Sequence, residues 1–139
     1  WDKVRGMTRT VSGSFDITRT AEPPFDAADG VVLGRMRFDK TFRGALEATS
    51  VVHMTSAMTS VKGSAGYVAV ERITGSLAGK AGSFVVLHTG LMDRGAPSLT
   101  ITVVPDSGTG ELVGLAGEMA IEIVEGEHRY RMTYTLGGA

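Results

Sequence analysis

The sequence contains no cysteine, and this absence removes several kinds of site at once. Disulfides, thiol nucleophiles and thiolate metal sites are all excluded. No apolar run approaches the length of about 20 residues that a membrane-spanning helix needs. The net charge is only -1, from 14 basic and 15 acidic side chains. Because proteins that bind nucleic acid or acidic membranes carry a basic surplus, we expect no nucleic acid and no membrane among the partners.

Motifs for metals, phosphates and nucleophilic catalysis are missing as well. The three histidines, His53, His88 and His128, have no local ligand spacing, and no H-E-x-x-H motif occurs. The segment "SGTGELVG" lacks the G-K-[ST] ending of a phosphate loop, and no G-x-S-x-G elbow is present. We therefore expect neither a metal nor a cofactor, and we take the cytoplasm as the default location.

What the chain does contain is 19 glycines, spread between apolar segments rather than gathered in one tract. Glycine in such positions punctuates short strands. A length of 139 residues suits one domain with a real core. We assign residues 7–139 to a single domain. Residues 1–6, which precede Met7, are expected to be an N-terminal extension or remnant outside the fold.

Apolar residues follow strand spacing, and no segment of a dozen residues keeps helical periodicity. Eight antiparallel strands at even spacing, joined by glycine-rich turns, are typical of an all-β, closed up-and-down barrel. Such a barrel has room for side chains or one small ligand. The longest connection, 21–30, holds two prolines and is expected to be a mobile loop or lid. The expected strands are 8–18, 33–42, 45–58, 66–74, 82–90, 97–104, 117–124 and 128–136.

The last two expected strands allow a prediction of their register. Polar and apolar side chains alternate along both, and directly opposed residues share a face. A register that pairs Ile123 with Tyr130 and Glu122 with Arg131 places the apolar faces together. It leaves Gly126 and Glu127 as a two-residue loop, with glycine first as a type II′ turn requires.

The stretch "GSFVVLHTG" (82–90) is apolar on both faces, apart from His88. A strand of this kind is usually covered on both sides. The barrel interior would cover one face. The other face favours a subunit interface, hence a homo-oligomer (dimer or trimer), although a helix or a long loop would serve equally well.

Glu71 and His88 are the strongest candidates for a site. Glu71 lies on the face opposite Arg72, and because an unpaired arginine is costly to bury, the face with Glu71 is expected inside. If the turn between the two strands has an even number of residues, Glu71 and His88 meet in the interior. Such a pair is an acid/base arrangement, a polar anchor for a ligand, or a pair that only satisfies itself in the core.

The expected contacts of a bound ligand are inward-facing aromatic and apolar side chains. The two tyrosines of the last strand are included because they could add hydroxyl donors to the pocket. These residues are Tyr67, Phe84, Val86, Tyr130, Met132 and Tyr134.

The run "GYVAVERITGSLAGKAGSFVVLHTG", together with "TVVPDSGTGELVGLAGE" and "GEHRYRMTYTL", resembles an uncharacterised family of small bacterial proteins. That family is a domain of unknown function with the allene oxide cyclase-like β-barrel. Its most specific pattern here is E-R-x-x-G-x-L-x-G-x-x-G-S-F-x-x-x-H, from Glu71 to His88, and the likeness extends over roughly residues 7–137. It implies an eight-stranded barrel that tends to self-associate, and it implies no activity.

Plant allene oxide cyclases bind an apolar epoxide inside the barrel and steer its cyclisation, but none of their catalytic residues can be matched to this chain. Three functions therefore stay open. The barrel could bind a small, mainly apolar ligand, act as a cofactor-free isomerase or cyclase through Glu71 and His88, or be a structural or interaction protein with a filled interior. An open apolar cavity above about 300 Å³ at this pair would favour the first two.

Overall fold

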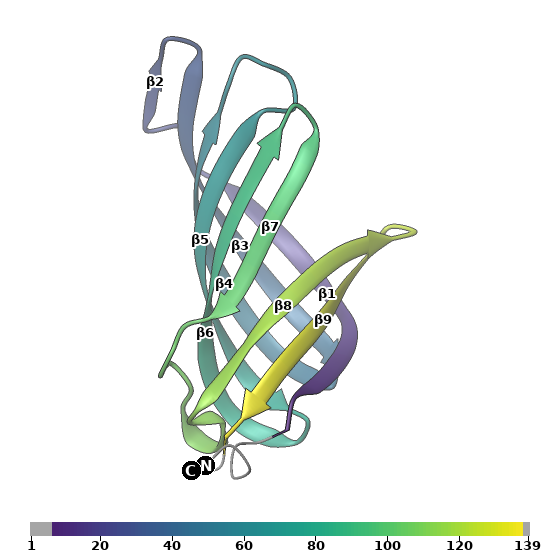
Figure 1. The fold of residues 1–139 in the computed structure, drawn as a ribbon. Helices are drawn as coiled ribbons and strands as arrows, with labels where there is room; N and C mark the ends of the chain where they lie inside the picture. Colours follow the sequence, from purple (N-terminus) through teal and green to yellow (C-terminus); the bar gives the residue numbers. More distant parts are fainter. Residues whose placement is uncertain (1–6, 138–139) are drawn as a thin grey trace.

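The chain folds into an antiparallel β-barrel, as expected from the strand spacing (Figure 1). The computed structural model describes residues 7–137. Within that range no helix is long and apolar enough to cross a membrane. The strands are β1 (Arg9–Ala21), β2 (Asp26–Ala28), β3 (Val31–Gly44), β4 (Leu46–Met58), β5 (Ala65–Leu77), β6 (Lys80–Asp93), β7 (Ala96–Val103), β8 (Leu115–Val124) and β9 (Glu127–Leu136), with one 3-10 turn, η2 (Gly110–Leu112).

The barrel closes through its first strand. The sheet runs in the order β1-β9-β8-β7-β6-β5-β4-β3, and β1 pairs with β3 to complete the ring. All eight expected strands are present. The segment 21–30 was expected to be a loop, and this is wrong over residues 26–28, because β2 pairs there with the start of β3.

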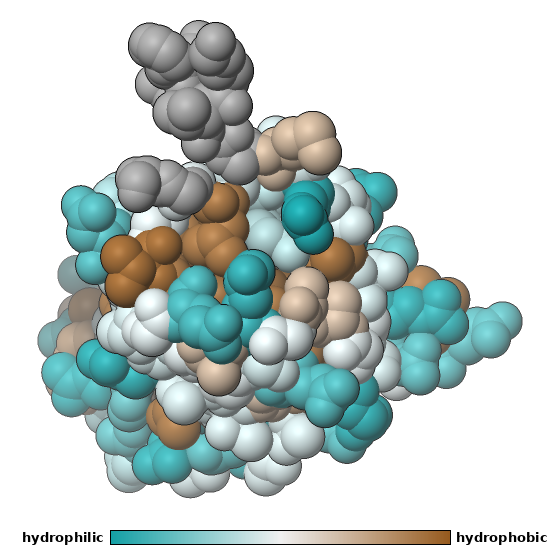
Figure 2. Space-filling model, turned by 90° about the horizontal axis from the view of Figure 1, so that it is seen from below, coloured by the Kyte–Doolittle hydropathy of each residue, from teal (hydrophilic) through white to brown (hydrophobic). Residues whose placement is uncertain are grey.

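Alternation decides which side chains enter the barrel. One end of the interior, which we call the closed end, is packed solid and holds the β3–β4 and β5–β6 turns. Figure 2 looks at this end and shows it filled by side chains, except where the grey residues hide the surface. The core consists of Phe15, Phe42, Leu46, Ala48, Ile73, Leu77, Phe84, Val86, Ile101, Val103, Leu112, Leu115, Met119, Tyr130, Met132 and Tyr134.

Residues 104–114 seal the closed end beside β6. The backbone N–H of Thr109 donates to the carbonyl of Ser83 at 2.8 Å, and that of Val104 donates to the carbonyl of Val85 at 2.8 Å. Gly82 permits this approach, because a Cβ there would lie 2.1 Å from the Thr109 carbonyl oxygen. The glycine-rich segment that failed to match a phosphate loop therefore continues the sheet edge.

The register of the β8–β9 hairpin differs from the prediction by two residues. Ile121, not Ile123, lies opposite Tyr130, and the turn consists of Glu125 and Gly126. Both turn residues have positive φ (52° and 81°), as in a type I′ turn, which suits the twist of a hairpin. The predicted faces remain correct, because a shift of two residues preserves alternation.

The opposite end of the barrel, the open end, contains a gap between two strands. β7 and β8 pair only through Ile101–Met119 and Thr102–Glu118. Beyond these pairs the β8–β9 hairpin leans away from β7 (Figure 1). By contrast, β5 and β6 pair along their whole length. A hollow of the interior lies beside this gap, because Leu99 of β7 and Ile121 of β8 both line it.

The outer face of β6 carries exposed apolar side chains, as the sequence indicated, and exposed valines of β5 lie beside them, although Arg72 is on the same face of β5. Val68, Val70, Leu87 and Leu91 are exposed there, Val70 to 51%. The subunit interface expected on this face stays a prediction.

Candidate functional site

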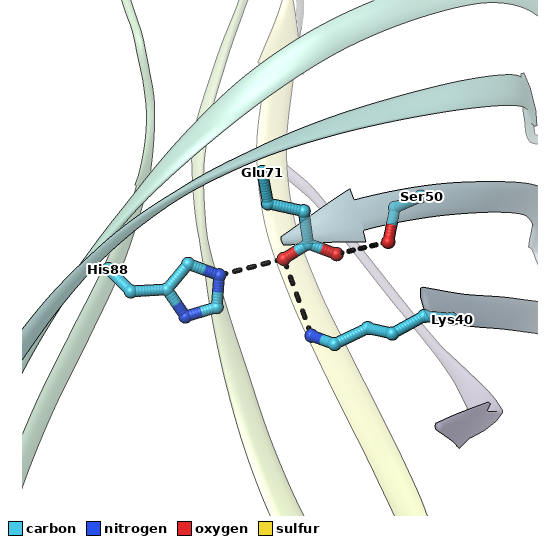
Figure 3. A network of polar contacts seen from close by, with 4 residues as sticks. All are labelled: Lys40, Ser50, Glu71 and His88. Carbon is cyan, nitrogen blue, oxygen red and sulfur yellow. Dashed lines mark hydrogen bonds and ion pairs between the residues drawn. The ribbon is translucent and has the colours of Figure 1, made fainter. Parts of the chain in front are cut away.

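Glu71 lies at the centre of a polar cluster inside the barrel. Its exposed fraction is 0%, as expected for the inward face of β5. Its Oε1 accepts hydrogen bonds from His88 Nε2 at 2.7 Å and Lys40 Nζ at 3.3 Å, and its Oε2 accepts one from Ser50 Oγ at 2.6 Å (Figure 3). The four residues come from the adjacent strands β3, β4, β5 and β6, so the sheet itself fixes the cluster.

The turn between β5 and β6 brings Glu71 and His88 to the same side. It consists of two residues, Ala78 and Gly79, both with positive φ. The sequence predicted that Glu71 and His88 would lie on the same face if this turn had an even number of residues, and it has two.

Lys40 and Ser50 are site residues that were missed from the sequence. Lys40 follows strand alternation between Phe38 and Phe42, and Ser50 lies on the inner face of β4. A lysine with the same parity as two phenylalanines was a signal that the strand carries an inward cation. Its exposed fraction is 5%.

Two aromatic rings of the core lie close to the Lys40 ammonium. Its Nζ lies 4.9 Å from the centre of the Phe15 ring and 5.7 Å from that of Phe42, within the range of cation–π attraction. An ammonium has three N–H donors, and among residues 7–137 the bond to Glu71 uses one of them. Lys40 therefore keeps donor capacity beyond its ion pair.

The environment keeps Glu71 ionised. Burial alone raises the pKa of its carboxyl group, but the hydrogen bond from His88, the Lys40 charge and the hydrogen bond from Ser50 together hold the pKa below its ordinary value of 4.5. An ionised carboxylate only accepts hydrogen bonds, so Nε2 of His88 must carry the hydrogen. The other ring nitrogen, Nδ1, points away from Glu71 (Figure 3).

His88 borders open space beside Glu71. Its side-chain hydrogen bond to the described residues is made through Nε2, so Nδ1 is not used in that bond. The residue is only 5% exposed, but it lines a space inside the barrel.

That space is a cavity of about 290 Å³ between the cluster and the open end. Its wall is apolar except at Lys40, Tyr67, His88 and His128. Glu71 and Ser50 lie behind Lys40 and His88 and do not line it. The lining residues are Phe15, Ile17, Phe38, Lys40, Val52, Met54, Tyr67, Ala69, His88, Leu99, Ile121 and His128.

Of the six side chains expected to contact a ligand, Tyr67 lines the cavity. Its ring lies against Gly90, where a Cβ would come within 2.3 Å of a ring carbon. The other five lie deeper, in the packed core, and are Phe84, Val86, Tyr130, Met132 and Tyr134. The Tyr130 hydroxyl faces the closed end, where it accepts from the Leu46 N–H at 2.9 Å and donates to the Arg43 carbonyl at 2.9 Å.

The remaining polar features do not form a comparable site. His53, the one histidine of the three that does not line the cavity, is exposed on the outer face of β4. Within residues 7–137, no group of three or more His, Asp and Glu side chains is placed to hold a metal ion. Two larger hollows, of about 640 and 680 Å³, are lined by neither Glu71 nor His88, although Lys40 and Ser50 also border the second.

Acid is expected to remove stability that Glu71 provides. Its pKa is lower in the folded chain than its ordinary value of 4.5, so its contribution is complete above that pH. The contribution is lost as the pH falls through the folded-state pKa. Urea unfolding between pH 7 and pH 3 should show a steeper loss of unfolding free energy in the wild type than in Glu71→Gln. Parallel curves for the two proteins would contradict this assignment.

Comparisons with known proteins agree on one family. Residues 11–134 match the family model described as "Protein of unknown function (DUF3224)". No curated protein matches the chain. A similar solved structure is that of a protein with unknown function from the DUF3224 family of Shewanella oneidensis MR-1. It has 50% sequence identity and a TM-score of 0.88, with 92% of this chain and 97% of that chain covered. Neither comparison names the allene oxide cyclases, so that likeness remains a sequence-based expectation.

Proposed function

Because the chain belongs to the DUF3224 family, whose function is unknown, we propose a function from the site itself: the barrel binds one small, mainly apolar ligand in its cavity. The observation that carries this proposal is the apolar space of about 290 Å³ above the Glu71 cluster. A barrel built only as a structural element would fill its interior with side chains, as the closed end of this one does.

The size of the cavity suggests the size of the ligand. At about 30 Å³ per heavy atom, the volume that water occupies in the liquid, the cavity holds about ten heavy atoms. Burying each CH₂ group contributes roughly 0.8 kcal/mol. Eight carbons contribute about 6 kcal/mol in this way, and association costs several kcal/mol, so such a ligand should bind with a Kd of roughly millimolar order.

The gap between β7 and β8 supports entry of such a ligand. Leu99 of β7 and Ile121 of β8 both line the cavity. Both residues lie beyond the Ile101–Met119 pair, where β7 and β8 are no longer hydrogen-bonded to each other. A ligand can therefore reach the cavity from the open end without breaking the hydrogen bonds of a continuous sheet.

Filling the cavity is expected to abolish binding of 1-octanol. Ala69 lies on its wall, and in Ala69→Phe the ring would occupy the space of the ligand. Val70→Phe is the matched control, because Val70 is the next residue on β5 and points outward. Calorimetric titration should show binding to the wild type and to the control, with Kd values within about threefold of each other. The proposal fails if the wild type does not bind octanol or if Ala69→Phe binds it equally well.

A second candidate function is a cofactor-free isomerase, favoured by the hydrogen bond between Glu71 and His88. Glu71 would orient the ring through Nε2, and Nδ1 would take a proton from a ligand and return it. A direct test follows 2-octanone in D₂O by NMR. General-base action predicts exchange of the hydrogens next to the carbonyl, lost in His88→Gln. The absence of exchange with the wild type would rule out this function for such ketones.

A further inference from the structure

Two polar side chains face the ligand space from the floor of the cavity. Lys40 and His88 both line it, whereas Glu71, which binds them both, does not. Both Glu71 oxygens are already used by three donors. The cluster therefore presents ammonium N–H groups and Nδ1 of an imidazole to a ligand, and it keeps its carboxylate behind them.

The charges of Glu71 and Lys40 balance each other before any ligand enters. Glu71 is ionised and Lys40 is cationic, so the pair is neutral in sum. A carboxyl group that enters with its proton keeps this balance. One of its oxygens can accept from Lys40, and a single proton can lie between the other oxygen and Nδ1 of His88. Whichever of the two holds that proton, the net charge is unchanged.

We propose that the ligand carries a carboxyl group on a short apolar chain, with the carboxyl group bound between Lys40 and His88 and the chain lying along the apolar wall. This inference rests on the proposed binding function and names the chemical class of the ligand. The cavity accommodates about ten heavy atoms, which corresponds to an eight-carbon acid such as octanoic acid.

Ligands with other head groups fit these two side chains less well. An ammonium group would meet the Lys40 charge directly and would find the Glu71 oxygens already occupied, with 0% of that residue exposed. A hydroxyl group can accept from Lys40 and donate to His88, but with one oxygen it makes both contacts through the same atom. A carboxyl group has two oxygens, one for each partner.

The first test compares three ligands of equal chain length on the wild-type protein. Calorimetric titration with octanoate, 1-octanol and octylamine measures the preference for the head group without any substitution. We expect octanoate to bind at least about tenfold more tightly than octylamine, a difference of about 1.4 kcal/mol. Equal affinities for these two would overturn the carboxyl anchor.

The second test removes the anchor and leaves the cavity in place. The double variant Lys40→Met with Glu71→Gln deletes the cation and its counter-charge together, so no unpaired charge is buried. Octanoate affinity should fall about tenfold or more, and 1-octanol affinity, which depends on Lys40 only through one neutral hydroxyl oxygen, should fall by a smaller factor. Arg72→Met is the control, because it removes one cation from the outer face of the same strand as Glu71.

The outcomes separate this inference from the proposed function. If 1-octanol binds but octanoate binds no better to the wild type than to the double variant, the anchor is wrong and the binding function stands. If neither ligand binds the wild type, the binding function is wrong, and the anchor with it. The comparison of octanoate with octylamine uses the wild-type protein. It therefore tests the inference even if the double variant does not fold.

Discussion

Replacing Glu71 with leucine is expected to lower the free energy of unfolding by about 3–5 kcal/mol. The Glu71 carboxylate accepts hydrogen bonds from Lys40, Ser50 and His88. Its removal leaves the Lys40 ammonium without its counter-charge, although Lys40 is only 5% exposed. A buried charge without a partner pays its desolvation cost with nothing to offset it. Urea unfolding at neutral pH, followed by far-ultraviolet circular dichroism, measures the change in the free energy of unfolding.

A double-mutant cycle separates the loss of the pair from the cost of the unpaired charge. Lys40→Met should also destabilise by about 3–5 kcal/mol, because it leaves the Glu71 carboxylate buried without its cation. Lys40→Met combined with Glu71→Leu should recover most of that loss, since both charges are gone. If the combined variant were as unstable as the sum of the two single variants, the charge pairing would not be the source of the effect.

Truncating Phe84 to alanine is expected to destabilise the fold by about 3–5 kcal/mol and to leave ligand binding unchanged. Phe84 is 1% exposed and packs in the core beneath the polar cluster, away from the cavity wall. The lost side chain therefore creates a void in the closed half of the barrel. Urea unfolding measures the first effect, and calorimetric titration with 1-octanol measures the second.

Val85→Ala is the matched control for Phe84→Ala, because Val85 is the next residue on β6 and points outward. It should cost much less stability, about 1 kcal/mol or below. A Phe84→Ala protein that folds stably but binds octanol more than about tenfold more weakly would show that Phe84 contacts the ligand, as its face on the strand first suggested.

Alternation along the strands is enough to predict the barrel and the faces of its residues. The inward positions of Glu71 and His88 follow from the cost of burying Arg72 and from the two-residue turn between β5 and β6. Alternation does not say how far along the barrel a residue lies. Phe84 and Tyr130 share the inner face with the cavity residues, yet they lie too deep to line the cavity. Five of the six expected ligand contacts are therefore on the inner face but outside this cavity, and their contact with a ligand stays a prediction.

Two further features depend on interactions that no single strand reveals. Lys40 and Ser50 join the cluster because β3 and β4 lie next to β5 in the ring, and their registers bring the side chains to the same level. The β8–β9 register depends on whether Glu125 adopts positive φ, which decides between two turns that leave the faces identical. Side-chain pattern is the same for both turns, so pattern alone does not choose between them.

The closure of the ring through β1 has a consequence for how the chain acquires its structure. β1 pairs with β3 on one side and with β9 on the other, so its second edge finds a partner only after the last strand has been synthesised. Until then β1 and β8 each present an unpaired edge, the kind of edge through which chains associate wrongly. Contacts between strands so distant in the sequence also slow folding. We therefore expect a nascent chain that lacks β9 to remain an open sheet prone to aggregation, and the barrel to form after β9 leaves the ribosome.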